Sequence, residues 1–125
     1  LTHYRVDKMA KLTITQKPRV MTEEAKNLDL TRYGKAVFGM FSGQAQQVKL
    51  RFQNSLAGVV LDRFGKDAML VPDGNEHFTF TTEIVVSPVF YGWLAGFGER
   101  AEILFPESVR AEFAAQCRKT LELYK

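Results

Sequence analysis

Hydrophobic and polar positions alternate strictly over residues 47–53 and then change their period. Such alternation is typical of a strand with one buried face. The side facing the core would hold Val48, Leu50 and Phe52. From Asn54 onward apolar residues recur at helical spacing until Gly65, which favours a helix that ends there. The helical stripe consists of Leu56, Val59, Val60 and Phe64. A strand that runs straight into a packed helix predicts half of a β-α-β unit.

The rest of the chain after residue 46 completes this unit. We expect a strand over 68–71, a turn at 73–75, a long strand over 78–86, a helix over 89–97 and a strand over 100–105. The order β-α-β-β-α-β is that of the ferredoxin-like fold, an α+β architecture with helices on one face of an antiparallel sheet. In the last strand we expect inward side chains at Ala101, Ile103 and Phe105. An extra C-terminal helix follows, with a buried stripe of Val109, Phe113, Cys117, Leu121 and Tyr124.

The first 45 residues show a different pattern. Residues 3–15 alternate well enough for one strand, with Tyr4 and Val6 inward, but its sheet partners would precede Leu1. We therefore expect the chain to be part of a longer polypeptide. Residues 17–45 are predicted to be a linker with one short helix capped by Asp29. That helix would carry Leu30, Tyr33, Val37 and Phe38.

Composition and charge limit the classes of function. The chain has 125 residues, 46% hydrophobic and 25% charged, which fits one globular domain after the linker. Its net charge of +3 permits contact with a polyanion but does not require it. Cys117 is the only cysteine, so no intramolecular disulfide can form, and a cytoplasmic location is expected. No apolar run approaches the roughly 20 residues that span a bilayer, so we expect no membrane contact.

The sequence offers little catalytic chemistry. Neither His3 nor His77 has a second ligand at metal-binding spacing, and no nucleotide-binding loop or catalytic triad pattern is present. We therefore expect no enzyme, no metal and no cofactor. The exposed sheet face would carry Lys49, Arg51, Thr79, Thr81, Glu83, Arg100 and Glu102. The aromatic residues expected to face the helices instead are Phe52, Phe78, Phe80 and Phe105, which leaves no platform for stacking bases.

The helix over 89–97 is apolar almost all round, which is typical of a helix buried on both sides. Two interpretations remain open. Either the last helix covers it within the chain, or it packs against a second subunit or walls an effector pocket. The candidate interface or pocket residues are Phe90, Tyr91, Trp93 and Leu94.

Several short motifs, taken in order, resemble one family. The run Tyr4-Arg5-Val6-Asp7-Lys8-Met9 is similar to the closing strand of the WYL domain, an Sm-like barrel of bacterial transcriptional regulators, and the segment from Tyr33 to Gly43 is similar to the connector of these proteins. The motifs that resemble their C-terminal extension, WCX, are Val48-Lys49-Leu50-Arg51-Phe52, Asp62-Arg63-Phe64-Gly65, Asp73-Gly74, Phe97-Gly98 and Ile103-Leu104-Phe105-Pro106. The resemblance divides the chain into a strand left from a truncated barrel (1–16), a linker (17–45) and a WCX domain (46–125).

The resemblance implies the regulatory, non-enzymatic region of a transcriptional regulator that senses an effector and forms a homodimer. DNA would be bound by an upstream helix-turn-helix outside this chain. Two alternatives remain open: a single-stranded nucleic-acid-binding module, and a small-molecule site walled by Tyr91, Trp93 and the sheet. The residues that could contact a ligand or nucleic acid are Arg5, Asp7, Lys8, Lys49, Arg51 and Arg63.

Overall fold

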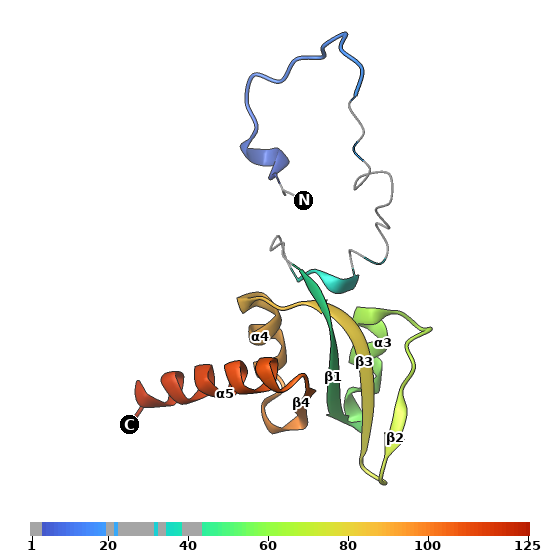
Figure 1. Ribbon diagram of the computed structural model, residues 1–125, viewed down its shortest axis with the longest axis vertical. Helices are drawn as coiled ribbons and strands as arrows, with labels where there is room; N and C mark the ends of the chain where they lie inside the picture. Colours follow the sequence, from blue (N-terminus) through green and yellow to red (C-terminus); the bar gives the residue numbers. More distant parts are fainter. Residues whose placement is uncertain (1–3, 20–21, 23–31, 33–34, 39–43) are drawn as a thin grey trace.

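The computed structural model describes residues 4–19, 22, 32, 35–38 and 44–125 (Figure 1). Over these ranges the chain forms a mixed helix and strand fold with one open antiparallel sheet of four strands, ordered β2-β3-β1-β4. The strands are β1 (Ala45–Gln53), β2 (Val71–Asp73), β3 (His77–Val85) and β4 (Ala101–Phe105). The helices are α3 (Ala57–Phe64), α4 (Pro88–Ala95) and α5 (Glu107–Glu122), with short 3-10 turns at Val6–Lys8, Asn54–Leu56 and Gly98–Arg100.

The central strand β1 has the buried face that its alternation predicts. It pairs with β3 from Ala45 opposite Val85 to Gln53 opposite His77. Phe52 lies opposite Phe78, and their rings stack with centroids 5.6 Å apart. The fully buried positions of this strand are Val48, Leu50 and Phe52. These side chains share one core with the apolar faces of α3 and α4.

The edge strand β4 departs from the expected alternation. Leu50 lies opposite Ile103, but Lys49 lies opposite Phe105, so the register skips Leu104. Such a bulge changes the face on which the following side chains lie. Phe105 therefore shares the open face with Lys49 and is 57% exposed. The expectation of an inward Phe105 is wrong for this reason, whereas Ile103 is buried as predicted.

The described part of the expected linker packs against the domain. We call Lys35–Phe38 the connector. Ala36 and Val37 are buried with Val85 and Ala45 at one end of the sheet, and Phe38 belongs to the main core. Asp29, Leu30, Tyr33 and the run 39–43 lie outside the described residues.

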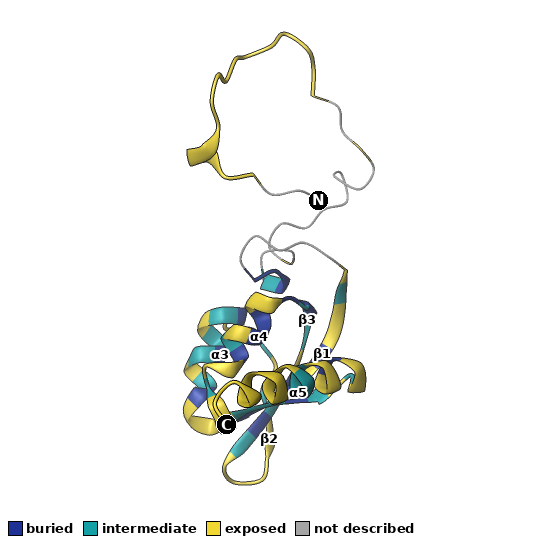
Figure 2. Ribbon diagram, turned by 90° about the vertical axis from the view of Figure 1, so that its left-hand side faces the viewer, coloured by how far each residue is buried: buried dark blue, intermediate teal, exposed yellow. Residues whose placement is uncertain are grey.

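Residues 4–19 form no strand. They consist of the 3-10 turn Val6–Lys8 and irregular chain, and every one of them is exposed (Figure 2). The expected strand over 3–15 is therefore wrong for the described residues 4–15, as are the inward positions of Tyr4 and Val6, which are more than 70% exposed. A strand needs a neighbour to pair its backbone polar groups, and none of the four strands of the sheet pairs with this segment.

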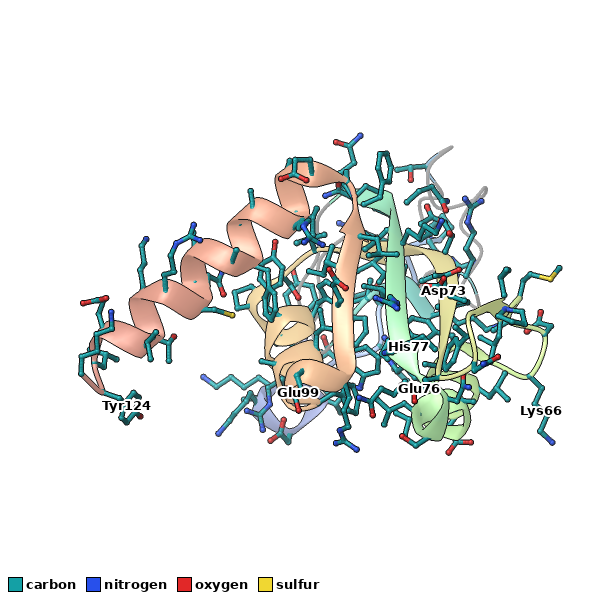
Figure 3. All side chains as sticks on the ribbon, turned by 90° about the horizontal axis from the view of Figure 1, so that it is seen from below. Lys66, Asp73, Glu76, His77, Glu99 and Tyr124 are labelled. Carbon is teal, nitrogen blue, oxygen red and sulfur yellow. The ribbon has the colours of Figure 1, made fainter. Side chains whose placement is uncertain are left out.

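The last helix extends past the body of the domain (Figures 1 and 3). It contains 16 residues, a length of about 24 Å at the usual rise per residue. Of its expected stripe, Val109 is buried and Phe113 half-buried, whereas Cys117, Leu121 and Tyr124 are exposed. The prediction of a buried Cys117 is wrong because the second half of α5 extends beyond the body of the domain, so the domain does not bury this side chain.

Candidate functional site: the two sides of α4

Helix α4 begins as its sequence predicts. The backbone N–H of Phe90 donates to Ser87 Oγ at 3.2 Å, and Pro88 occupies the first helical position. The helix ends at Ala95, two residues before the expected Phe97. It is not buried all round, because Val89, Gly92 and Ala95 are exposed. Its two sides therefore have different surroundings.

One side of α4 is filled by the connector. The ring of Phe38 lies 5.3 Å from the rings of both Phe90 and Trp93 and 6.2 Å from that of Phe64 on α3, measured between centroids. We call Phe64, Phe90 and Trp93 the aromatic slot. Phe38 is only 4% exposed in it. Edge and tilted ring contacts of this kind add to the free energy gained from burial.

Arg63 closes the slot from α3. Its Nη2 donates to the carbonyl oxygen of Val37 at 3.0 Å. Its guanidinium carbon lies 3.9 Å from the centroid of the Phe38 ring and 5.0 Å from that of Phe64. These are cation–π distances. Burial lowers the pKa of Arg63 below its ordinary value, but a guanidinium remains charged at neutral pH.

The other side of α4 borders an open apolar groove. This groove, of about 490 Å³, lies between α4 and the outer half of α5. Its lining includes Tyr91, Gly92 and Ala95 of α4 and Phe113, Cys117 and Leu121 of α5. Tyr91 and Phe113 stack with ring centroids 5.5 Å apart at its inner end. The last helix thus covers part of α4 through Phe113 and leaves the rest of this side open.

Tyr91 marks the boundary between core and groove. The residue is 3% exposed, and burial is the largest cause that raises the pKa of its phenol to about 12. The carboxylate of Glu112 on α5 raises this pKa further, since a second negative charge beside it is unfavourable. The neutral phenol is therefore the form that the folded chain prefers.

The candidate interface residues do not share one surface. Phe90, Leu94 and Tyr91 are buried within the chain, and Trp93 is half-buried in the aromatic slot. Tyr91 lines the groove, whereas Trp93 contacts Phe38, Phe52, Phe64 and Phe97. The two residues expected to wall one pocket therefore contribute to opposite sides of α4.

The predicted nucleic-acid contacts are also divided. Arg5 pairs with Asp7 at 2.6 Å, with Lys8 in the same short turn, and Arg63 holds the connector. On the open sheet face, Arg51 pairs with Asp73 at 2.9 Å and lies 3.8 Å from Glu102. The other expected members of this face are Lys49, exposed beside Phe105, and Thr79, Thr81, Glu83 and Arg100.

Further ion pairs neutralise the acidic side chains of the open face. Arg110 of α5 donates to Glu102 at 2.7 Å and to the carbonyl oxygen of Ile103 at 2.7 Å. Glu102 is the first cause of the raised pKa of Arg110. Glu83 is paired with Arg32. Arg100 lies outside the strands, in the turn Gly98–Arg100, and donates to the carbonyl oxygen of Phe97. Figure 3 shows Asp73, Glu76 and His77 at the β2–β3 end of the sheet.

The docking of Val37 and Phe38 was not predicted. The only signal in the sequence was that these two apolar residues precede a glycine-containing run, Gly39 to Gly43. Nothing in the local pattern indicates that Phe38 reaches a slot built by residues 26 to 55 positions later. Arg63 likewise lies on the polar side of its helix, and the sequence pattern does not indicate its contact with the connector.

Two further observations concern the chemistry of the described ranges. Within residues 4–19, 35–38 and 44–125, no three His, Cys, Asp or Glu side chains gather in a way that could bind a metal ion. None of the helices α3, α4 and α5, nor any other in the part of the chain that the structure describes, combines the length and apolar composition that crossing a membrane requires.

Comparison with known proteins identifies the family of the domain. Residues 44–121, which contain the whole sheet and nearly all of α5, match the WCX domain. No curated protein matches the chain. The matched range begins after the connector and includes both α3 and α4, so it contains the slot but not Phe38. The chain belongs to the WCX domain family, the C-terminal extension of WYL-type regulators.

Proposed function

We propose that this chain is the non-enzymatic regulatory region of a bacterial, cytoplasmic WYL-type transcriptional regulator, which senses an effector and forms a homodimer. DNA would be bound by a helix-turn-helix outside this chain. Membership of the WCX family supports this role. The sheet order β2-β3-β1-β4, with α3 and α4 each following a strand, supports the ferredoxin-like assignment within it.

The observation that carries the proposed homodimer is the projecting half of α5 together with the turn that follows it. Leu121, Leu123 and Tyr124 are 54%, 79% and 83% exposed, and Leu121 and Tyr124 both line the groove beside α4. An apolar helix face next to an apolar groove is a common feature of interaction surfaces. The same surface contains both the protruding and the receiving parts, as a two-fold contact between identical chains requires.

The charges of α5 favour a second copy in antiparallel orientation. Its first eight residues carry Glu107, Arg110 and Glu112, a net charge of −1, while its last eight carry Arg118, Lys119 and Glu122, a net charge of +1. An antiparallel pair of α5 helices would place the acidic half of each beside the basic half of the other. A parallel pair would place like charges together.

Light scattering of the 125-residue chain over a range of concentrations tests this proposal. We expect a dimer at micromolar concentration and a monomer for Leu121→Glu, because a buried carboxylate would face the apolar groove of the partner. The matched control is Ala111→Glu, which adds the same charge at an exposed position of α5 outside the groove lining. A chain that stays monomeric at high micromolar concentration would refute dimerisation, whereas a dimer indifferent to Leu121→Glu would refute only this surface.

The regulatory role has its own test. Deletion of the gene encoding this chain should change the abundance of a confined set of transcripts, and complementation should restore them. A transcript profile that is the same with and without the gene, under conditions in which the protein is produced, would contradict the role. This outcome is independent of the oligomeric state.

One observation favours a second function, the binding of single-stranded nucleic acid. The bulge in β4 places Phe105 on the open face opposite Lys49, so one aromatic ring and one cation lie side by side there. Bases stack on such rings, and phosphates pair with such cations. Affinity for a single-stranded oligonucleotide should fall with rising salt and weaken in Phe105→Ala. No binding at low salt would exclude this function.

A further inference from the structure

The connector contacts the domain on both faces of the sheet. Just before it, Arg32 pairs with Glu83, which belongs to the open side of β3. Ala36 and Val37 then pack on Ala45 and Val85, where β1 and β3 meet at one end of the sheet. Phe38 finally enters the aromatic slot on the helical side. This path wraps the end of the sheet and fixes where the chain enters the domain.

The polar contacts of the connector differ in strength. Lys35 and Asp67 pair at 3.6 Å, but their side chains are 40% and 85% exposed, and such pairs contribute little. Arg63 instead makes a half-buried hydrogen bond to Val37 and covers the Phe38 ring. A flat guanidinium can do both at once, whereas a lysine ammonium cannot cover a ring and reach a carbonyl with the same geometry.

Strand pairing and core packing hold the rest of the domain together. β1 and β3 pair over nine residues of each strand, and β1 also pairs with β4. Val48, Leu50, Phe52 and Ile84 are fully buried in the main core, which Phe38 joins, whereas Ala36 and Val37 belong to a separate cluster. Loss of the connector would open the slot between α3 and α4 but would leave these ladders paired. The connector is therefore a separable unit held mainly by Phe38 and Arg63.

We infer that α3 and α4 form a docking slot for the connector, that Arg63 is the residue that latches it, and that the connector can be released while the WCX domain stays folded. Docked, it fixes the point at which the preceding chain enters the domain. Released, it uncouples that part of the chain from the domain. The partner that fits the slot is a short segment of this same chain with Phe38 as its anchor. This inference goes beyond the proposed function and does not depend on dimerisation.

Trp93 provides a specific probe, because it is the only tryptophan in the chain and lies against Phe38. In the full 125-residue chain, Arg63→Ala should shift the Trp93 emission to the red and increase its quenching by acrylamide. Amide hydrogen exchange of residues 35–38 should become faster, while exchange of β1 and β3 and the far-UV circular dichroism stay as in the native chain. Arg63→Lys should show the same changes to a smaller extent.

The matched control is Arg110→Ala, which removes another arginine that donates to a backbone carbonyl but lies on α5. Its Trp93 emission should equal that of the native chain. If Arg63→Ala unfolds the whole domain, the same measurements of Trp93 emission and hydrogen exchange on Arg63→Lys and Phe38→Leu test the inference. The inference is overturned if the Arg63 variants leave Trp93 emission and the exchange of 35–38 unchanged, or if exchange rises equally in β1 and β3. In that second case the connector would be inseparable from the domain.

Discussion

The two sides of α4 are both apolar, yet only one is filled by the chain itself. On the slot side, Phe38 packs between α3 and α4 and is 4% exposed. On the groove side, α5 contacts Tyr91 through Phe113 and then runs outward, leaving Leu121 and Tyr124 exposed. The same low polarity in the sequence thus corresponds to a completed core on one side and to an open surface on the other.

This difference shows why an apolar helix cannot be assigned to core or interface from its composition alone. The helix is covered wherever another segment reaches it, and that depends on where the connector enters and where α5 leaves. Two segments at the margins of the WCX domain therefore decide the surroundings of α4.

Removal of the Phe38 ring on the slot side should change the free energy of unfolding more than any substitution on the groove side. Phe38→Ala should lower the free energy of unfolding by about 3–5 kcal/mol, the usual cost of deleting a buried phenylalanine and leaving a cavity. Phe105→Ala, the same substitution at a 57% exposed position, should stay within about 0.5 kcal/mol of the native chain. Urea denaturation measures both values. Equal effects would contradict the assignment of Phe38 to the core.

A smaller change on the groove side, Gly92→Ala, should raise the stability of the monomer and lower its tendency to self-associate. A Cβ added at Gly92 would meet no atom within 4 Å, so Gly92→Ala should stabilise the monomer by about 0.5–1 kcal/mol through helix propensity. It should also weaken self-association, because the new methyl group narrows a groove that the second copy would enter. Thermal unfolding and light scattering separate the two effects. Stronger association of Gly92→Ala would contradict the proposed surface.

A further effect is confined to alkaline pH. In the unfolded chain the phenol of Tyr91 titrates near its ordinary value, whereas in the folded chain its pKa is raised to about 12. Between these values the folded state holds a proton that the unfolded state has lost, so stability should fall as pH rises from about 10 to about 12. Tyr91→Phe should show a shallower decline over this window than the native chain. Identical slopes for the two chains would contradict the buried, neutral phenol.

Local patterns predicted much of the fold. The alternation of Val48, Leu50 and Phe52 indicated β1 correctly, and Ser87-Pro88 marked the start of α4. These signals depend on residues close in sequence. Patterns also indicated a mixed fold with one antiparallel sheet of four strands and three helices.

The errors come from contacts that sequence spacing does not report. The side of Phe105 depends on a bulge set by pairing with β1, and the exposure of Cys117 depends on how far α5 runs past the sheet. Likewise, Arg63 lies against a connector that precedes it by more than 20 residues. The expected strand over 3–15 has no pairing neighbour for its described residues 4–15, and no local alternation can supply one.

Hydrogen exchange of the whole chain at low and high protein concentration tests the contrast between the two sides of α4 most directly. Residues 35–38 should be protected to the same degree at both concentrations, because their partners Phe90, Trp93 and Arg63 belong to the same chain. The last turns of α5 should gain protection as concentration rises and a second copy covers the groove. Rapid exchange of 35–38, or concentration-independent exchange in the last turns of α5, would contradict this account.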